Sequence, residues 1–373
     1  MKTIKALWRS CAAVYRGVAD GLLLTVLVVF LASFALYGIH YFIRRLSPPA
    51  ALNTEMLQVV HPHLNRIEIR DMLNETYFDR PFMYSPYVGF TERTRTGNHV
   101  SVSPEMFRWG TNRSAKLSDD SVQKLCLFGG STMFGYGVDD RNTIGAYLQG
   151  LLDKNRSNMR LVVFNLGHGY FFSQQEAALF QKMIADGIHC EIALFFDGVN
   201  EKQSAPHFTS EEKILFDAMN YDVFRLFLIS FLRTTLMSDI SKRIVPIAAE
   251  SGLSPDQSVA RYVNLRKIVR QLAKSNGTQA IFVIQPLPGF RNGFLNNAFT
   301  GNFCAKGADC EKLLITRMKA MAGLADGIDT HDLTGLFWTW NRTPFLDDVH
   351  YTPHANREIA VALEKIIRKS LSP

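Results

Sequence analysis

The chain has little charge for its size and almost no excess of one sign beyond its first fifty residues. Charged side chains make up 20% of its 373 residues, and the formal net charge is +7. Residues 1–50 hold six basic groups and one acidic group, so a net of +5 lies there and only +2 remains for the rest. A nearly neutral body without a Lys/Arg run offers no footprint for a polyanion, which argues against nucleic-acid binding.

Other absences narrow the class further. None of the five cysteines forms a CxxC pair, so no zinc site is expected. No G-x-G-x-x-G spacing and no Walker-type Lys occur, and we expect neither a metal nor a cofactor. Hydrophobic residues at 47% exclude a disordered or collagen-like chain, and the length suffices for one large core.

One long uncharged run is present. Gly21–Ile43 has 23 residues and no formal charge, which is long enough to span a bilayer of about 30 Å. The hydrophobic part of a cleaved signal peptide is shorter, so the run predicts an uncleaved single-pass anchor. Four basic residues precede the run and two follow it: Lys2, Lys5, Arg9, Arg16, Arg44 and Arg45. This bias predicts a cytoplasmic N-terminus, with the bulk of the chain periplasmic or on the cell surface.

The cysteines agree with that location only loosely. Cys304 and Cys310 share a Gly-containing loop, where either a local disulfide or two free thiols would fit. Cys126 and Cys190 lie in or beside apolar runs typical of strands, and we expect them to be buried thiols.

The region after residue 120 alternates between strand and helix patterns. Strands are predicted at residues 124–128, 161–165, 191–196 and 279–285, with a weaker one at 327–332. Helices are predicted at residues 143–154, 174–186, 258–275, 311–322 and 353–370. This alternation predicts an α/β fold with a central parallel sheet that is covered on both faces. Ligands of such sheets bind beyond the carboxyl ends of the strands.

The expected organisation has four parts. They are a cytoplasmic tail (1–20), a transmembrane helix (21–43), a linker with an N-terminal extension that packs on the main domain (44–120), and the α/β domain (121–373). About 80 residues separate the third and fourth strands, which predicts an insertion at 204–254. Its apolar part, 221–237, contains two arginines, so we expect either a helix packed on the domain or one lying on the bilayer surface.

Polar residues at the strand ends have the composition of a serine-hydrolase site. Ser131 follows the first strand in GGSTMFGYG, and Asn200 follows the third in DGVNE. Asp347 and His350 stand three residues apart before the last helix. A serine needs a base to take its proton, and the base needs a carboxylate to orient it. Each residue alone is ordinary in a turn or a cap, and their ordered combination points to this chemistry.

The segments GGSTMFGYGV, NLGHGY, DGVNE and DDVH resemble, in order, conserved blocks of the SGNH (GDSL-like) hydrolase superfamily. The resemblance runs from about Lys124 to the C-terminal helix. It implies a flavodoxin-like α/β/α sandwich and cofactor-free cleavage of ester bonds. In its terms Ser131 is the nucleophile, His350 the base and Asp347 the residue that orients it. The oxyanion hole would combine the Ser131 N–H, Asn200 and a backbone N–H of the second block, for which we name Gly169.

Two positions depart from the pattern. Gly130 stands where the family's GDS motif has Asp, and Tyr170 stands where the second block usually has Gly. Tyr170 is therefore a second candidate for the backbone N–H. We also expect Tyr136, His168 and Tyr170 to contact the substrate. Asp348 competes with Asp347 for the orienting role, but the three-residue spacing to His350 favours Asp347.

Three functions fit these residues. The first is a membrane-anchored extracytoplasmic serine esterase or deacetylase that acts on an acylated carbohydrate or lipid through an acyl-enzyme. The second is an O-acyltransferase that passes the acyl group to a cell-envelope polysaccharide. The third is a catalytically silent binding protein of the cell envelope, which the two departures motivate.

Overall fold

The computed structural model describes residues 2–46, 54–78, 82–110, 114–154, 161–198, 200–201, 255–286, 330–337, 339–347 and 349–371. Several predictions concern residues outside these ranges: the insertion at 204–254 with its apolar part, the helix at 311–322, the Cys304–Cys310 pair and Asp348. The chain divides into two compact units, which we describe separately. In the described part, the first unit is helix α1 (Lys2–Leu46) and the second begins at residue 54.

Helix α1 contains the apolar segment of the chain. It is one continuous helix, and its most apolar stretch is Val14–Leu36, with 23 residues and almost entirely exposed side chains. This stretch begins earlier than the predicted Gly21–Ile43, because the helix continues without a break past Arg16 and Asp20. By length and composition, it is the one helix in the described residues that is suited to cross a membrane.

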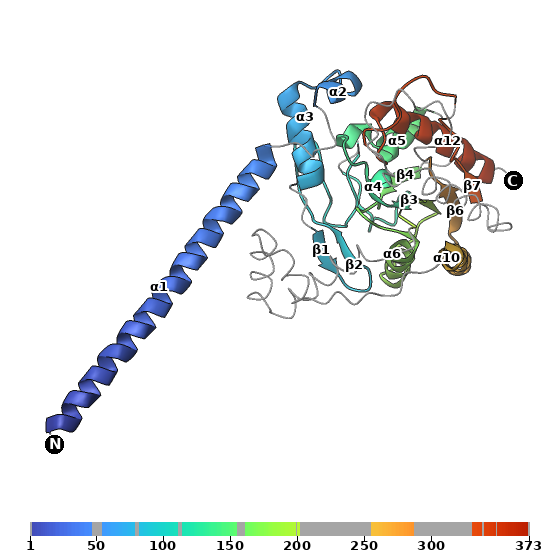
Figure 1. Ribbon diagram of the computed structural model, residues 1–373. Coiled ribbons are helices and arrows are strands. Elements are labelled where there is room, and N and C mark those ends of the chain that lie inside the picture. Colours follow the sequence, from blue (N-terminus) through green and yellow to red (C-terminus); the bar gives the residue numbers. More distant parts are fainter. Residues whose placement is uncertain are drawn as a thin grey trace. The chain divides into compact units, whose positions relative to one another are not determined.

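The second unit is built on a five-stranded sheet, shown in Figure 1. Its strands are β3 (Gln123–Gly129), β4 (Leu161–Asn165), β5 (Ile192–Asp197), β6 (Gln279–Ile284) and β7 (Thr330–Asp332). All neighbouring pairs are parallel, and the order across the sheet is β4-β3-β5-β6-β7. Taken in order along the chain this is 2-1-3-4-5, the flavodoxin-like order. The predicted α/β fold with a parallel sheet is confirmed.

In the described part of the chain, two helices cover each face of the sheet (Figure 1). One face packs on α5 (Ile144–Lys154) and α12 (Pro353–Leu371), and the other on α6 (Ser173–Ala185) and α10 (Pro255–Ser275). Successive strand residues point to opposite faces, so Leu125 and Leu127 join the first core and Cys126 and Phe128 the second. Because both faces are buried, the strands read as continuous apolar runs, which is why their positions could be predicted closely.

The extension has secondary structure that its weak periodicity did not predict. It forms α2 (Thr54–Val60), α3 (Arg66–Leu73), the π-helix η1 (Asn74–Phe78) and a hairpin of β1 (Phe82–Ser85) and β2 (Gly89–Glu92). Side chains of α2 and α3 form a small core with Val138 and Leu346, which lie on loops that follow Ser131 and precede Asp347. The extension is therefore packed directly against the loops of the predicted site.

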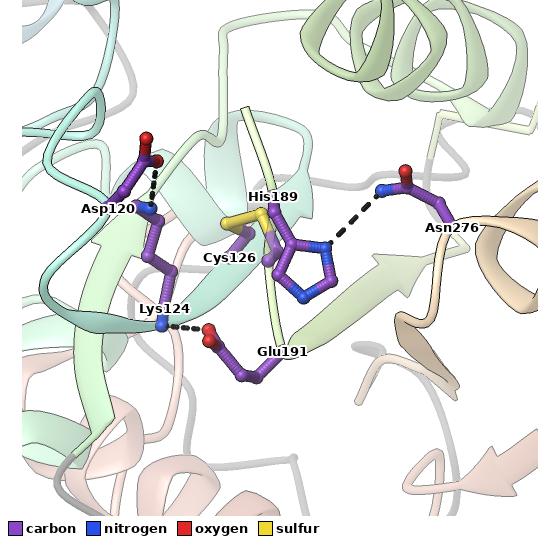
Figure 2. The surroundings of a disulfide bond; sticks show 7 residues. Asp120, Lys124, Cys126, His189, Glu191 and Asn276 are labelled. Atoms are coloured by element: carbon purple, nitrogen blue, oxygen red, sulfur yellow. Dashed lines mark hydrogen bonds and ion pairs between the residues drawn. A yellow bond between two sulfur atoms is a disulfide. The ribbon is translucent and has the colours of Figure 1, made fainter. Parts of the chain in front are cut away.

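The prediction that Cys126 and Cys190 are free thiols is wrong. Figure 2 shows that they form a disulfide, with Cα atoms 6.0 Å apart. Cys126 lies on β3, and Cys190 lies just before β5, the strand that pairs with β3. The pair could not be recognised from the sequence, because the two cysteines are 64 residues apart and only the pairing of the two strands brings the sulfur atoms together. A buried disulfide is typical of proteins that fold in an oxidising compartment.

Candidate active site

Ser131 lies at a sharp turn from strand to helix. Strand β3 ends at Gly129, and Ser131 is the first residue of the short helix α4 (Ser131–Phe134). The turn has no space for a side chain at Gly130, because a Cβ there would lie 2.4 Å from Asn200 Nδ2 and 2.9 Å from the Phe171 carbonyl oxygen. Gly130, which replaces the Asp of the family pattern, therefore allows Asn200 to approach the backbone beside Ser131.

Asp347 and His350 form a hydrogen-bonded chain with Ser131. His350 Nε2 lies 2.8 Å from Ser131 Oγ, and His350 Nδ1 lies 2.6 Å from Asp347 Oδ2. The second oxygen, Oδ1, accepts the N–H groups of Val349 and His350 at 2.9 and 2.8 Å. The loop is closed at its base, where the Leu346 N–H donates to the His350 carbonyl. The structure thus brings together the three residues that were predicted to act as nucleophile, base and orienting carboxylate, although Ser131 and His350 lie 219 positions apart in the chain.

Asp347 is held in its ionised form. Burial alone would raise the pKa of its carboxyl, but the charge of His350 and the hydrogen bonds from His350 and Val349 lower that pKa well below its usual range. An ionised carboxylate fixes the proton of His350 on Nδ1, which leaves Nε2 free to accept the proton of a serine hydroxyl.

Two tyrosines enclose the His350 ring. Tyr136 stacks on it with centroids 5.1 Å apart and an interplanar angle of 22°, and Tyr77 contacts it edge-on at 5.8 Å. Tyr136 is 4% exposed, and its hydroxyl donates to Glu92 Oε1 at 3.0 Å. Tyr136 is therefore nearly buried against the histidine, where we had expected it to contact the substrate.

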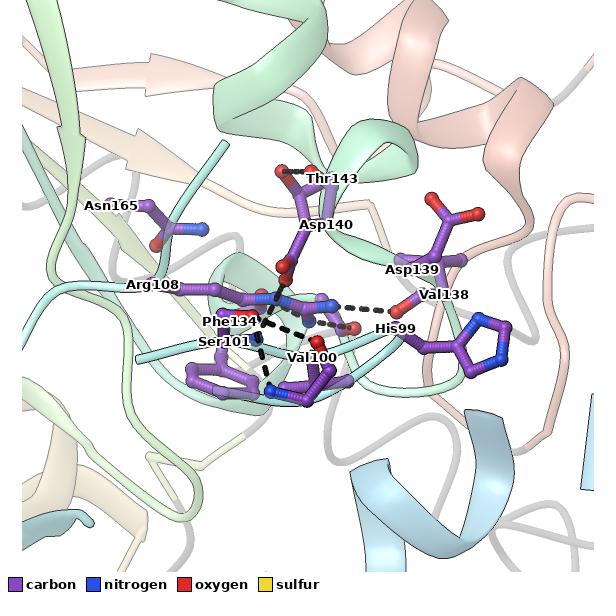
Figure 3. Close-up of polar contacts among 12 residues, drawn as sticks. His99, Val100, Ser101, Arg108, Phe134, Val138, Asp139, Asp140, Thr143 and Asn165 are labelled. Carbon is purple, nitrogen blue, oxygen red and sulfur yellow. Dashed lines mark hydrogen bonds and ion pairs between the residues drawn. The ribbon is translucent and has the colours of Figure 1, made fainter. Parts of the chain in front are cut away.

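Arg108, from the extension, holds the loop that follows Ser131 (Figure 3). Its buried guanidinium donates to the carbonyl oxygens of Phe134, Gly135 and Val138 at 2.9, 2.5 and 2.7 Å. It also pairs with Asp140 at 3.0 Å. The carbonyls at the end of a helix have no partner within it, and here one arginine satisfies them. Arg108 therefore connects the extension to the end of α4, the helix that begins at Ser131.

Asn200 lies close to the nucleophile. Its Nδ2 donates one hydrogen to the Phe171 carbonyl at 2.8 Å, which leaves the second amide hydrogen for another acceptor. Together with the contact to Gly130 described above, this places an amide donor beside the backbone of Ser131. The Ser131 N–H belongs to the first turn of α4, where backbone donors have no acceptor within the helix.

The second block differs from our expectation. The Gly169 N–H donates to Glu92 Oε1 at 3.0 Å, so a carboxylate from the extension already occupies the proposed oxyanion donor. His168 is fully buried and its Nδ1 accepts the Glu92 N–H, so it does not contact substrate. Burial lowers the pKa of His168 to about 3. Tyr170 is 42% exposed with φ of +64°, the left-handed region that favours glycine, and its ring contacts that of Phe82 with centroids 5.9 Å apart.

A buried cluster of charged side chains lies at the end of β5, close in the chain to Asn200. Arg266 pairs with Asp197, at the end of β5, and with Glu176 of α6. Glu201 accepts the backbone N–H and the hydroxyl of Ser173 at 2.5 and 2.9 Å. Burial, together with the nearby Asp197, raises the pKa of Glu201 to about 7. These contacts tie the segment that carries Asn200 to the start of α6.

The sequence did not reveal the supporting residues Tyr77, Glu92 and Arg108. All three belong to the extension, where no motif or periodicity marks them. Among the described residues, no group of three or more His, Cys, Asp or Glu side chains is arranged to hold a metal ion. The arrangement that is present suits nucleophilic attack by a serine hydroxyl.

Comparisons with known proteins find remote structural likenesses. Neither a family model nor a curated protein sequence matches the chain. LAE5, an alpha/beta hydrolase enzyme from the metagenome of Lake Arreo, is 15% identical with a TM-score of 0.39, covering 67% of this chain and 97% of its own. A variant of Axe2, an acetyl xylan esterase from Geobacillus stearothermophilus, is 14% identical with a TM-score of 0.39, covering 66% and 94%.

A third solved structure, from Desulfitobacterium hafniense, is described as a lipolytic protein of the G-D-S-L family. It is 13% identical with a TM-score of 0.37, covering 65% of this chain and 99% of its own. At these values the likeness is too remote to assign a reaction, and the chemistry rests on the geometry of Ser131, His350 and Asp347.

Proposed function

We propose that the chain is a membrane-anchored serine hydrolase that cleaves ester bonds of an acylated carbohydrate or lipid outside the cytoplasm. The observation that carries this proposal is the continuous hydrogen-bonded chain from Ser131 Oγ through the His350 ring to Asp347. The order nucleophile, base and carboxylate is that of serine hydrolases in general.

The proposed reaction proceeds in two halves. Ser131 Oγ attacks the carbonyl carbon of the ester while His350 Nε2 takes the hydroxyl proton, and Asp347 stabilises the imidazolium. The Ser131 N–H and Asn200 Nδ2 donate to the oxyanion that develops. When the intermediate collapses, the alcohol leaves with the proton from His350 and the acyl group stays on Ser131. A water molecule, activated by His350, then releases the acid.

Membrane anchoring is part of the proposal. The 23-residue apolar stretch of α1 is long enough to cross a bilayer, and more basic residues precede it than follow it. The Cys126–Cys190 disulfide supports an oxidising compartment for the second unit. After expression in a bacterial host, the chain should stay in the membrane fraction through an alkaline carbonate wash. Protease added from outside should digest the second unit once the outer membrane is made permeable.

The experiment that tests the reaction uses the full chain in detergent micelles. The wild-type protein should hydrolyse a small activated acetyl ester and become labelled by a serine-directed fluorophosphonate. Ser131→Ala should abolish the labelling and lower kcat at least 10³-fold, the scale seen when a triad nucleophile is removed. Ser121→Ala is the matched control, since Ser121 is an exposed residue in the turn before β3.

The outcomes separate the candidate functions. A folded wild-type protein that is neither active nor labelled would contradict the proposal and favour a silent binding protein. Labelling with slow hydrolysis, accelerated by an added polysaccharide acceptor that becomes acetylated, would identify an acyltransferase that uses the same acyl-enzyme.

A further inference from the structure

Tyr77 contacts two members of the hydrogen-bonded chain. It lies on η1, in the extension, 270 positions before Asp347. Its hydroxyl donates to Asp347 Oδ2 at 2.9 Å and lies 3.3 Å from His350 Nδ1. Asp347 Oδ2 is the same oxygen that faces His350 Nδ1, so the Tyr77 hydroxyl contacts both partners of the hydrogen bond between His350 and Asp347.

The ring of Tyr77 is packed from several sides. It meets the rings of His350 and Tyr136 edge-to-face, with centroids 5.8 and 5.5 Å away, and Tyr136 stacks on His350, so each of the three rings contacts the other two. A Cβ on Gly137, a residue with φ of +79°, would lie 3.4 Å from the Tyr77 hydroxyl, so the loop after Ser131 passes close to it. These contacts leave the hydroxyl little freedom to turn away from Asp347.

The segment around Tyr77 is anchored independently of the site. The neighbouring Glu75 accepts the backbone N–H groups of Asn98, His99 and Val100 at 3.0, 2.9 and 2.8 Å. Thr76 Oγ1 donates to the Met72 carbonyl at 2.7 Å, which ties η1 to α3. The tyrosine is thus presented to the site by a rigid part of the extension.

We propose that Tyr77 is a positioning residue of the active site: its hydroxyl fixes the Asp347 carboxylate toward His350, and its ring holds the imidazole against Tyr136. This inference rests on the proposed serine-hydrolase function. Tyr77 acts through Asp347 and His350, so it should affect catalysis without affecting substrate binding.

The physical consequence of losing the hydroxyl has a definite sign. A carboxylate that accepts fewer hydrogen bonds is more basic and holds an imidazolium more strongly. The base works only when neutral, so stronger retention of the imidazolium moves the acid limb of the kcat/KM profile to higher pH. In the described part of the chain, the side chains in contact with His350 include Asp347, Ser131, Tyr77 and Tyr136, and the Tyr77→Phe change removes only the Tyr77 hydroxyl.

The test compares Tyr77→Phe with the wild-type chain in detergent micelles, using the activated acetyl ester. We expect kcat to fall about tenfold, the scale of one hydrogen bond to a charged group. KM should stay within about twofold, and the acid limb should move up by about half a pH unit. Rates are normalised to the fraction labelled by fluorophosphonate, so partial unfolding does not enter them. The matched control is Tyr87→Phe, since Tyr87 is a 90% exposed tyrosine of the same extension.

The outcomes distinguish this inference from the proposed function. Suppose that Ser131→Ala inactivates the protein but the separate variant Tyr77→Phe keeps the wild-type kcat and pH profile. The positioning role is then wrong and the hydrolase proposal stands. A uniform loss of rate at every pH, without movement of the acid limb, would also overturn it, because that is the effect of a structural role alone. If the wild-type protein neither hydrolyses the ester nor is labelled, both proposals fail together.

Discussion

The strand-end loops and the N-terminal extension contribute to one site in different ways. The loops after β3 and before α12 carry Ser131, Asp347 and His350, which the proposed reaction uses directly. The extension supplies Tyr77 and Arg108, which hold those residues in place. The difference teaches that residues with a reactive group can be recognised locally, whereas residues that position them are recognised only by their contacts.

The extension also differs in how it is attached. The α/β region is cross-linked by the Cys126–Cys190 disulfide, whereas in the described residues the extension is held by buried polar contacts and by apolar side chains, of which Phe90 and Phe107 join the large core on one face of the sheet. Side chains of α2 and α3 pack on Val138 and Leu346, next to the loops that carry the reactive residues. If these contacts are as important as the geometry indicates, damage to the extension should affect activity as strongly as damage to the loops.

Among the variants that test the role of the extension against that of the loops, Arg108→Met is expected to have the largest effect. The change leaves the Asp140 carboxylate buried without its cation and three carbonyl groups without a donor. We expect a loss of about 3–5 kcal/mol in the free energy of unfolding, measured by urea denaturation of the full chain in micelles.

Two controls accompany Arg108→Met. The double variant Arg108→Met/Asp140→Asn should recover part of the loss, because it removes the uncompensated charge. Arg93→Met alters an exposed arginine of the same extension and should change the free energy of unfolding little. An Arg108→Met protein as stable and active as the wild type would show that the extension is only a linker.

Asn200→Ala tests the loops by themselves. Removal of one oxyanion donor costs about 10²–10³ in kcat, and we expect a loss of this size with slower fluorophosphonate labelling. The fold should persist, since the change only removes the hydrogen bond to the Phe171 carbonyl. Asn276→Ala, at the far end of α10, is the matched control and should be fully active. An unchanged rate for Asn200→Ala would remove Asn200 from the site.

The disulfide provides the smallest expected effect on activity. Cys126→Ala/Cys190→Ala should lower the free energy of unfolding by about 2–4 kcal/mol, the range for a natural cross-link. Activity per folded molecule should be retained, because the bridge contacts none of the reactive groups. Peptide mapping of the non-reduced wild type should find both cysteines linked. Two alkylated thiols at these positions would contradict the bridge and weaken the case for an oxidising compartment.

The close prediction of the α/β region has a physical cause. Its strands are buried on both faces and its helices are amphipathic, so burial imposes a pattern that neighbouring residues display together. Strand β4 has the predicted bounds, 161–165, and helix α12 ends one residue beyond its prediction. The extension lacks this repetition, because its elements are short and each buries only a few side chains, such as Ile69 and Met72 of α3 and Phe90 of β2.

Within the site, the residues that were misjudged are those whose surroundings come from elsewhere in the chain. Tyr136 and His168 stand in segments that suggest a cleft, yet Glu92 accepts the hydroxyl of the first and donates its N–H to the second. The same carboxylate also occupies the Gly169 N–H. No property of these segments indicates a partner from the extension, since such pairings depend on how the chain packs.

The sequence by itself determined the α/β class and the apolar helix and pointed to the three residues that the proposed reaction uses, because burial patterns and reactive side chains are local properties. The tertiary structure decided that Cys126 joins Cys190, that Arg108 holds the loop after Ser131 and that Tyr77 meets Asp347. Such pairs lie 26 to 270 positions apart, and their contacts depend on sheet order and packing rather than on spacing along the chain.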